Sequence, residues 1–308
     1  MKRFRFLLLT CVTPVLLCAA SPLAGRWDIK VTPKSGNPYP DWMELAESGG
    51  KTTLRIQPRS GGARQISDFQ LNGAHLHLLF SKADAKNPEV TWDVATAGEG
   101  ITGTITRGGN VTAQFAGVRA PALDRKPPAS WSAAEPLFNG KDLSGWEPMT
   151  PNNNHWTVEN GELLNTAGGA NLKSTKSFED FQLHFEVNCP NDGNSGIYLR
   201  GRYELQIEYQ EVDANDPLHS MGSIYSFVGA STMLPRTPGK WETFDVTLVG
   251  RRITVVRNRV KTIDNQEIPG PTGGALDADE ATPGPFYIQG DHTGGLRYRN
   301  ITIRVPKR

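Results

Sequence analysis

The sequence predicts an all-β protein, and three observations lead to this fold class. Short segments in which apolar and polar residues alternate follow one another along most of the chain, which is the pattern of half-buried strands. The 32 glycines and 22 prolines supply frequent turns between these segments. Only "DANDPLH", residues 213–219, reads as a single helical turn.

The length and composition of the chain exclude some classes of protein. The chain has 308 residues, which is more than one average domain needs, with 37% hydrophobic and 21% charged residues. This balance is typical of a folded globular protein. The formal net charge is +1, so no strong field favours nucleic acid or a membrane surface. We therefore expect no nucleic-acid partner.

The first residues have the features of an export signal. Three positive charges precede the apolar stretch "FLLLTCVTPVLLCAA", which is too short to span a membrane. This stretch ends in small residues, the last of them Ala20, as a signal-peptidase cleavage site requires. We expect residues 1–20 to be a signal peptide and the mature protein to be exported, to a periplasm, with no membrane span. The alternative is a lipoprotein anchored on Cys18, but a large residue precedes this cysteine where a lipobox normally has a small one.

Residues 21–119 predict a small β domain. Hairpin-linked alternating segments of this kind form a meander, most economically closed as a small barrel. His75 and His77 share a strand face, but two histidines without a third ligand are more often surface or packed residues than a metal site. This domain reads as a binding or spacer module. The expected strands lie within residues 24–33, 41–47, 52–58, 66–73, 74–80, 89–98, 100–109 and 110–118.

Residues 120–136 predict a linker. The segment is rich in Pro and Ala and has little periodicity, and proline favours extended conformations without backbone donors. It separates the first domain from residues 137–308. That larger block consists almost entirely of alternating segments and turns, which fits a two-sheet antiparallel sandwich whose curved sheet can bind a ligand on its concave face.

One strand of the second block carries an unusual polar face. In "YELQIE", residues 203–208, the apolar residues alternate with Glu204, Gln206 and Glu208. Because strand side chains repeat every second residue, these three polar residues share one face. That face is either solvated or the floor of a site for a polar ligand.

An ordered series of motifs resembles a known family. The series is "LFNGKDLSGWE", "WTVENGEL", "FEDFQLHFE", "NSGIYLRG", "YELQI", "GSIY", "GKWETFDV" and "FYIQGDH" followed by "LRYRNI". It is similar to the 3-keto-disaccharide (3-keto-glucoside) hydrolase family, formerly a domain of unknown function with a concanavalin A-like fold. The resemblance covers roughly residues 137–305 and implies a concanavalin A-like β-sandwich (jelly roll). The first block looks, more loosely, like the small β domain that precedes it in some environmental bacteria.

The resemblance also implies a reaction. A ketone at C3 of a sugar acidifies the proton on C2, so a general base can remove that proton and form an enediolate. Expulsion of the glycosidic oxygen from C1 follows, and water can add to the resulting enone. The chemistry requires a base near C2, an electrophile for the C3 oxygen, and an acid or cation for the leaving group.

The resemblance assigns roles to eight residues. His292, Glu204 and Glu208 are the expected catalytic residues. His292 is a candidate base or metal ligand, so a divalent cation stays open as a cofactor. Here Gly290 stands between Gln289 and "DH", which departs from the family's commoner "QDHG" spacing and affects where His292 points. The expected substrate-binding residues are Arg200, Gln206, Tyr225, Gln289 and Arg297.

Two functions from different classes are therefore open. The first is an exported hydrolase or lyase that cleaves 3-keto-glycosides, with a carbohydrate as its partner. The second is a non-catalytic, lectin-like carbohydrate-binding protein on the same fold. Turnover of a 3-keto-glycoside distinguishes them.

Overall fold

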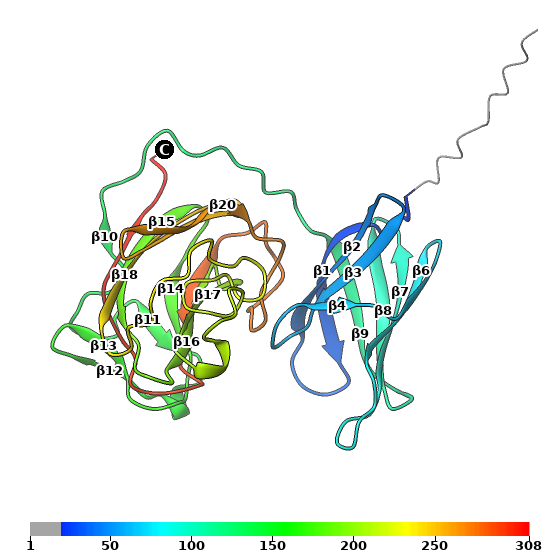
Figure 1. Cartoon of the computed structure of the whole chain (residues 1–308), viewed down its shortest axis with the longest axis horizontal. Helices are drawn as coiled ribbons and strands as arrows, with labels where there is room; N and C mark the ends of the chain where they lie inside the picture. The colour runs from blue at the N-terminus through cyan, green and yellow to red at the C-terminus, as the bar shows by residue number, and fades with distance from the viewer. Residues whose placement is uncertain (1–19, 308) are drawn as a thin grey trace, which may run out of the picture.

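The computed structural model describes residues 20–307, and the all-β prediction is confirmed (Figure 1). Residues 1–19 of the predicted signal peptide lie outside the described residues. Within the described range the helical segments are two 3-10 turns, η1 (Pro151–Asn153) and η2 (Glu211–Asp213). No helix in that range is long and apolar enough to cross a membrane.

The N-terminal unit is a nearly closed antiparallel sheet, here called the barrel. Its strand order is β4-β3-β2-β1-β9-β8-β7-β6-β5, and β4, at one edge, contacts β6 near the other edge. The strands are β1 (Gly25–Pro33), β2 (Tyr39–Ser48), β3 (Lys51–Gln57), β4 (Arg64–Ile66), β5 (Phe69–Asn72), β6 (His75–Ser81), β7 (Val90–Ala97), β8 (Gly100–Arg107) and β9 (Asn110–Arg119).

Apolar side chains at alternate positions of the barrel strands fill the interior of the barrel. Trp27, Ile29 and Val31 of β1 point inward and are almost completely buried, as is Phe115 of β9. Full burial of such a side chain contributes about 1.5–3 kcal/mol, so this apolar cluster stabilises the nearly closed sheet.

The C-terminal unit consists of two antiparallel sheets, here called the sandwich. One sheet has the order β12-β13-β22-β15-β18-β19-β20, with β10 paired to β22; the other has the order β11-β14-β21-β16-β17. The predicted β-sandwich is thus confirmed. Its strands are β10 (Glu135–Pro136), β11 (Trp146–Pro148), β12 (Trp156–Glu159), β13 (Glu162–Asn165), β14 (Leu172–Phe178), β15 (Phe181–Asn188), β16 (Asn194–Leu199), β17 (Tyr203–Glu208), β18 (Trp241–Val249), β19 (Arg252–Arg257), β20 (Val260–Glu267), β21 (Gly284–Ile288) and β22 (Arg297–Arg304).

The core of the sandwich lies between its two sheets. Phe185 and Phe244 stack there with ring centroids 4.9 Å apart. From β17, Tyr203, Leu205 and Ile207 enter this core and are completely buried. The opposite face of β17 therefore points away from the core, and this is the face that carries the three polar residues.

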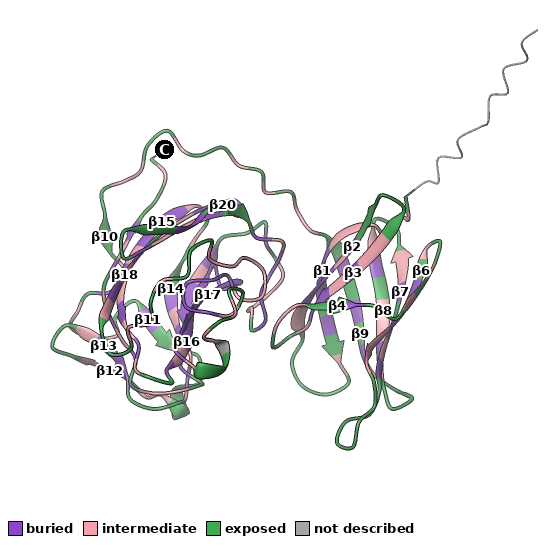
Figure 2. Ribbon diagram, viewed as in Figure 1, coloured by how far each residue is buried: buried purple, intermediate pink, exposed green. Residues whose placement is uncertain are grey.

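The segment predicted as a linker runs along the surface from the barrel to the sandwich (Figure 1). Arg125 forms ion pairs of 3.2 Å with both Glu179 and Asp180. Trp131 forms a bridge with Pro306, and β10 already pairs with β22. The last part of this segment is thus integrated into the sandwich. Figure 2 shows that it is mostly exposed or half-buried.

Candidate functional site

A row of side chains crosses the outer face of the five-stranded sheet. Tyr198 of β16 lies directly opposite Tyr287 of β21 on one side and Glu204 of β17 on the other. Beyond β17, the Tyr225 backbone N–H donates to the Glu204 carbonyl at 3.0 Å. Residues directly opposite one another in a sheet point to the same face. We call Tyr287, Tyr198, Glu204 and Tyr225 the polar row.

The two tyrosines form a stacked wall beside Glu204. Their ring centroids are 3.9 Å apart and their planes differ by 12°. The Tyr198 hydroxyl oxygen lies 2.8 Å from Glu204 Oε2 and 2.7 Å from the Gly273 carbonyl oxygen. A phenol has one proton to donate. When Tyr198 donates to Gly273, the contact with Glu204 therefore requires a protonated Glu204 carboxyl as the donor.

The environment of Glu204 favours this protonated form. Burial raises the pKa of Glu204 to about 8, and the nearby Asp291 also raises it. The Tyr198 hydrogen bond and the charge of His292 act in the opposite direction and lower this pKa. Glu204 can therefore exchange its proton near neutral pH, which is the property a general base or acid needs.

Gly196 of β16 makes space for the Glu204 side chain. A Cβ atom at this position would lie 2.5 Å from Glu204 Oε1. Two amide side chains flank this glycine: Gln206 is its partner on β17, and the Gln289 backbone N–H donates to the Gly196 carbonyl at 2.8 Å. The Glu204 carboxyl thus occupies the space that Gly196 leaves between the two amide residues.

Both amide side chains carry an unpartnered oxygen. Gln206 is 3% exposed and Gln289 is 9% exposed. Within residues 20–307, neither Gln206 Oε1 nor Gln289 Oε1 has a hydrogen-bond partner. Because buried polar atoms in proteins are nearly always paired, these two acceptors beside one carboxyl are candidates to accept hydrogen bonds from the hydroxyl groups of a ligand.

A histidine–aspartate pair stands at the exposed side of this group. His292 Nδ1 lies 2.7 Å from Asp291 Oδ1, and both side chains are nearly half exposed. The Asp291 hydrogen bond raises the pKa of His292, with a further contribution from the charge of Glu204. His292 is thus close enough to Glu204 for each charge to act on the other.

A second histidine–aspartate pair was not predicted from the sequence. His219 Nδ1 lies 2.6 Å from Asp216 Oδ2, and the His219 ring packs edge-on against Tyr225 with centroids 4.8 Å apart. The signal for it is the Asp-x-x-His spacing within "DANDPLH", a segment that the sequence predicts only as a helical turn. Tyr225 links this pair to the polar row.

The structure thus gathers five of the eight predicted residues, namely Glu204, Gln206, Tyr225, Gln289 and His292. Glu208 shares their sheet face but lies farther along β17. Its Oε2 accepts the Gln210 backbone N–H at 2.5 Å, and it lines a separate cavity of about 30 Å³.

Arg200 does not belong to this group, contrary to its predicted role in substrate binding. Its backbone has φ = 54°, so it belongs to the turn between β16 and β17, where the alternation of the strands is interrupted. Its Nη2 donates to the Tyr203 hydroxyl and to the Gly250 carbonyl, each at 2.9 Å. Tyr203 points into the core, so Arg200 has a structural position on the opposite side of β17 from Glu204.

Arg297 is also separated from this group, contrary to prediction. It lies on β22 in the other sheet of the sandwich. The next residue, Tyr298, is completely buried in the core, so alternation directs Arg297 outward. There its Nη1 pairs with Glu162 Oε2 at 2.9 Å. The motif position is present, but this sheet does not face the polar row.

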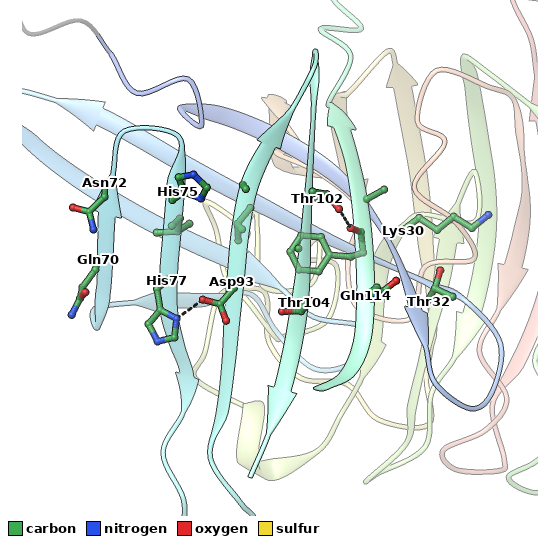
Figure 3. A pocket seen from close by; sticks show the side chains of 16 residues that line it. Lys30, Thr32, Gln70, Asn72, His75, His77, Asp93, Thr102, Thr104 and Gln114 are labelled. Carbon is green, nitrogen blue, oxygen red and sulfur yellow. Dashed lines mark hydrogen bonds and ion pairs between the residues drawn. The ribbon is translucent and has the colours of Figure 1, made fainter. Parts of the chain in front are cut away.

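A larger hollow, with a volume of about 720 Å³, lies on the barrel (Figure 3). Its polar side chains come from β1 and β5–β9, and His77 Nδ1 pairs there with Asp93 Oδ1 at 2.7 Å. His75 and His77 are both exposed. None of the eight predicted site residues lines this hollow. In the part of the chain that the structure describes, no group of three or more His, Cys, Asp or Glu is placed to hold a metal ion.

Solved structures with a similar fold include carbohydrate-related proteins. A "putative glycosyl hydrolase" from Parabacteroides distasonis is 26% identical, with a TM-score of 0.50, and the match covers 59% of this chain and 93% of that one. A second protein of that description and organism is 24% identical over 56% of this chain and 100% of its own, with a TM-score of 0.45. A carbohydrate-binding module from Bacillus subtilis is 17% identical over 52% of this chain and 94% of its own, with a TM-score of 0.34.

No curated protein matches this chain. A family model, described as the 3-keto-alpha-glucoside-1,2-lyase-like domain, matches residues 133–304. This range contains both sheets of the sandwich and every residue of the polar row. The match covers more than half of the sequence and confirms the resemblance that its motifs indicated. The chain belongs to the 3-keto-alpha-glucoside-1,2-lyase-like domain family.

Proposed function

We propose that this carbohydrate-active β-sandwich protein cleaves the glycosidic bond of 3-keto-glycosides by removing the C2 proton and eliminating the leaving group. We also propose that the protein acts after export, because its first 20 residues have the features of a signal peptide. Family membership supports the substrate class. The observation that carries the assignment of the site is the pair of unpartnered amide oxygens beside Glu204.

Glu204 is the base in this proposal. Its carboxylate takes the proton from C2, and the electrons of that bond form an enediolate with the negative charge on the C3 oxygen. A base whose pKa of about 8 lies near the working pH is effective for such a transfer. The Tyr198 hydroxyl turns toward the carboxylate when Glu204 loses its proton.

His292 and Tyr225 supply the remaining chemistry. The Asp291 partner favours the protonated imidazolium of His292, which stabilises the enediolate oxygen. The enediolate then expels the glycosidic oxygen from C1, and the Tyr225 hydroxyl is the proton donor for that leaving oxygen. In the hydrolytic outcome, the oxygen of a water molecule bonds to C1 of the enone, one proton of this water returns to the Tyr225 oxygen, and C2 regains its proton from Glu204. Gln206 Oε1 and Gln289 Oε1 accept hydrogen bonds from the sugar hydroxyls.

Turnover of an oxidised sugar tests the proposal. The full chain is incubated with a chromogenic 3-keto-glucoside and with 3-keto-trehalose, and the unoxidised sugars serve as controls. We expect release from the keto forms alone, and a decrease in kcat of about a hundredfold or more in Glu204→Gln. Arg297→Gln, a substitution on the other sheet, should leave the rate unchanged. Binding without turnover contradicts the proposal and supports a lectin-like protein.

A further inference from the structure

The barrel packs against the sandwich through a built interface. Asp28, Trp42 and Gln57 of the barrel are almost completely buried, and Trp42 lies outside the apolar core cluster of the barrel. Trp42 instead meets Phe227 of the sandwich edge-on, with ring centroids 5.4 Å apart, and the Arg55 guanidinium lies 5.2 Å from each ring. Trp42 and Phe227 thus form an apolar contact between the two domains.

Two segments of the sandwich lie at this interface and also hold the polar row. We call residues 270–276 the first support and residues 222–228 the second support. In the first support, the Gly273 and Gly274 carbonyls accept hydrogen bonds from Tyr198 and Tyr287 at 2.7 and 2.5 Å. Thr272 Oγ1 in the same support accepts the Glu204 backbone N–H at 2.9 Å.

The second support contains Tyr225 itself. The backbone of this segment pairs with the edge of β17. The Tyr225 N–H donates to the Glu204 carbonyl, and Leu205 and Ile224 form an antiparallel bridge. The position of the Tyr225 side chain, and of the His219 ring that packs on it, therefore depends on how this segment is held.

One turn of the barrel touches both supports. This barrel turn, residues 58–63, connects β3 to β4. The Gly274 N–H donates to the Arg59 carbonyl at 2.8 Å, and the Ala63 N–H donates to Ser226 Oγ at 2.8 Å. Gly62 fits closely against the second support, since a Cβ atom there would lie 2.7 Å from Ser226 Oγ and 3.2 Å from His219 Nε2.

We propose that the barrel is a positioning domain for the site: its turn holds both supports, and through them the hydroxyls of Tyr198 and Tyr287 and the side chain of Tyr225. Neither Arg59 nor Ala63 touches the substrate in this proposal, because both act through the supports. The consequence for turnover rests on the proposed function. A displacement of about 1 Å in such a supporting element can lower a rate by about a hundredfold.

The test compares two substitutions on the barrel turn of the full chain. Gly62→Leu introduces a side chain against Ser226 and His219, whereas Ser60→Leu places the same side chain at an exposed position of the turn. Ser226→Ala is a milder variant, which removes only the acceptor for the Ala63 N–H. Amide hydrogen exchange of the two supports is measured by mass spectrometry, together with kcat and KM on the 3-keto-glycoside.

In Gly62→Leu, we expect amide hydrogen exchange to accelerate about tenfold or more in both supports. In Ser226→Ala, we expect it to accelerate in the second support alone. In Gly62→Leu, kcat should fall at least tenfold, and the Ser60→Leu control should match the unmodified chain in both readouts. Unchanged exchange in the supports of a folded Gly62→Leu protein, or unchanged kcat despite faster exchange, overturns the inference. Absence of turnover in the unmodified chain refutes the proposed function, and the exchange readout then decides whether the barrel holds the supports.

Discussion

At the scale of single residues, the protonation of Glu204 depends first on its burial and then on the Tyr198 hydroxyl. This hydroxyl can donate to either the Glu204 carboxylate or the Gly273 carbonyl. Its hydrogen bond to the carboxylate lowers the pKa of Glu204, while burial raises that pKa to about 8. The balance of these two effects sets the pH at which the proposed base becomes available.

Tyr198→Phe should therefore move the pH profile of kcat/KM. The active form has an ionised Glu204, so kcat/KM rises with pH as this carboxyl loses its proton. A hydrogen bond to a charged group contributes about 1.5 kcal/mol or more, and one pH unit corresponds to about 1.4 kcal/mol. We expect the rising limb to move to higher pH by about one unit. A limb that stays in place, measured with the 3-keto-glycoside, contradicts the role of Tyr198.

At the scale of elements, β16 contributes space for Glu204 in addition to the Tyr198 hydroxyl. Gly196 lies between Gln206 and Gln289, and its missing side chain accommodates Glu204. A glycine inside a strand normally weakens it and marks a close approach of other atoms. Here the atoms that approach belong to the proposed catalytic carboxyl.

Gly196→Ala should displace the Glu204 side chain, because the added Cβ would lie 2.5 Å from its Oε1. We expect kcat to fall about tenfold or more, as for other misplaced catalytic groups, with the circular dichroism spectrum retained. Gly193→Ala is the matched control. Its Cβ would meet Cys189 and Pro190 and not the polar row. Equal losses of kcat in the two variants would refute a local effect on Glu204.

At the scale of the whole molecule, a carboxyl pair links the two domains. Asp28 of the barrel lies against Glu280 of the sandwich, near the Arg251 and Arg202 guanidiniums. Burial, followed by the charge of Glu280, raises the pKa of Asp28 to about 9. At neutral pH the folded protein therefore keeps a proton on Asp28 that the unfolded chain releases.

This difference in proton binding predicts a pH-dependent stability. Between the ordinary pKa of Asp28, 3.8, and its folded value of about 9, the folded state binds the extra proton, so its contribution to stability is lost as pH rises through this window. The free energy of unfolding should fall by up to about 1.4 kcal/mol per pH unit.

Urea unfolding at pH 6 and pH 8 measures this slope. In Asp28→Asn the fall between the two pH values should be smaller than in the unmodified chain. Asp84→Asn, at an exposed carboxyl whose pKa is lowered by local hydrogen bonds, should keep the original slope because that group is ionised at both pH values. Identical slopes in all three proteins would exclude Asp28 as the cause.

The sequence by itself determined the all-β class, the sandwich and the family. These follow from local information, because a period of two residues assigns each strand residue to a face and the ordered motifs identify the domain. The same period correctly separated Glu204, Gln206 and Glu208 from the core-facing side of β17.

Only the tertiary structure decided what meets that face. The two-residue alternation of a strand does not apply to a residue in a turn. Arg200 has a left-handed backbone in such a turn, and its side chain packs on the other side of β17. Arg297 keeps its motif position but lies on the other sheet. The neighbours of Glu204, namely Tyr198 and Tyr287, come from separate strands through pairing register. Contacts between the barrel turn and the two supports join residues more than 160 positions apart, and local periodicity contains no information about such contacts.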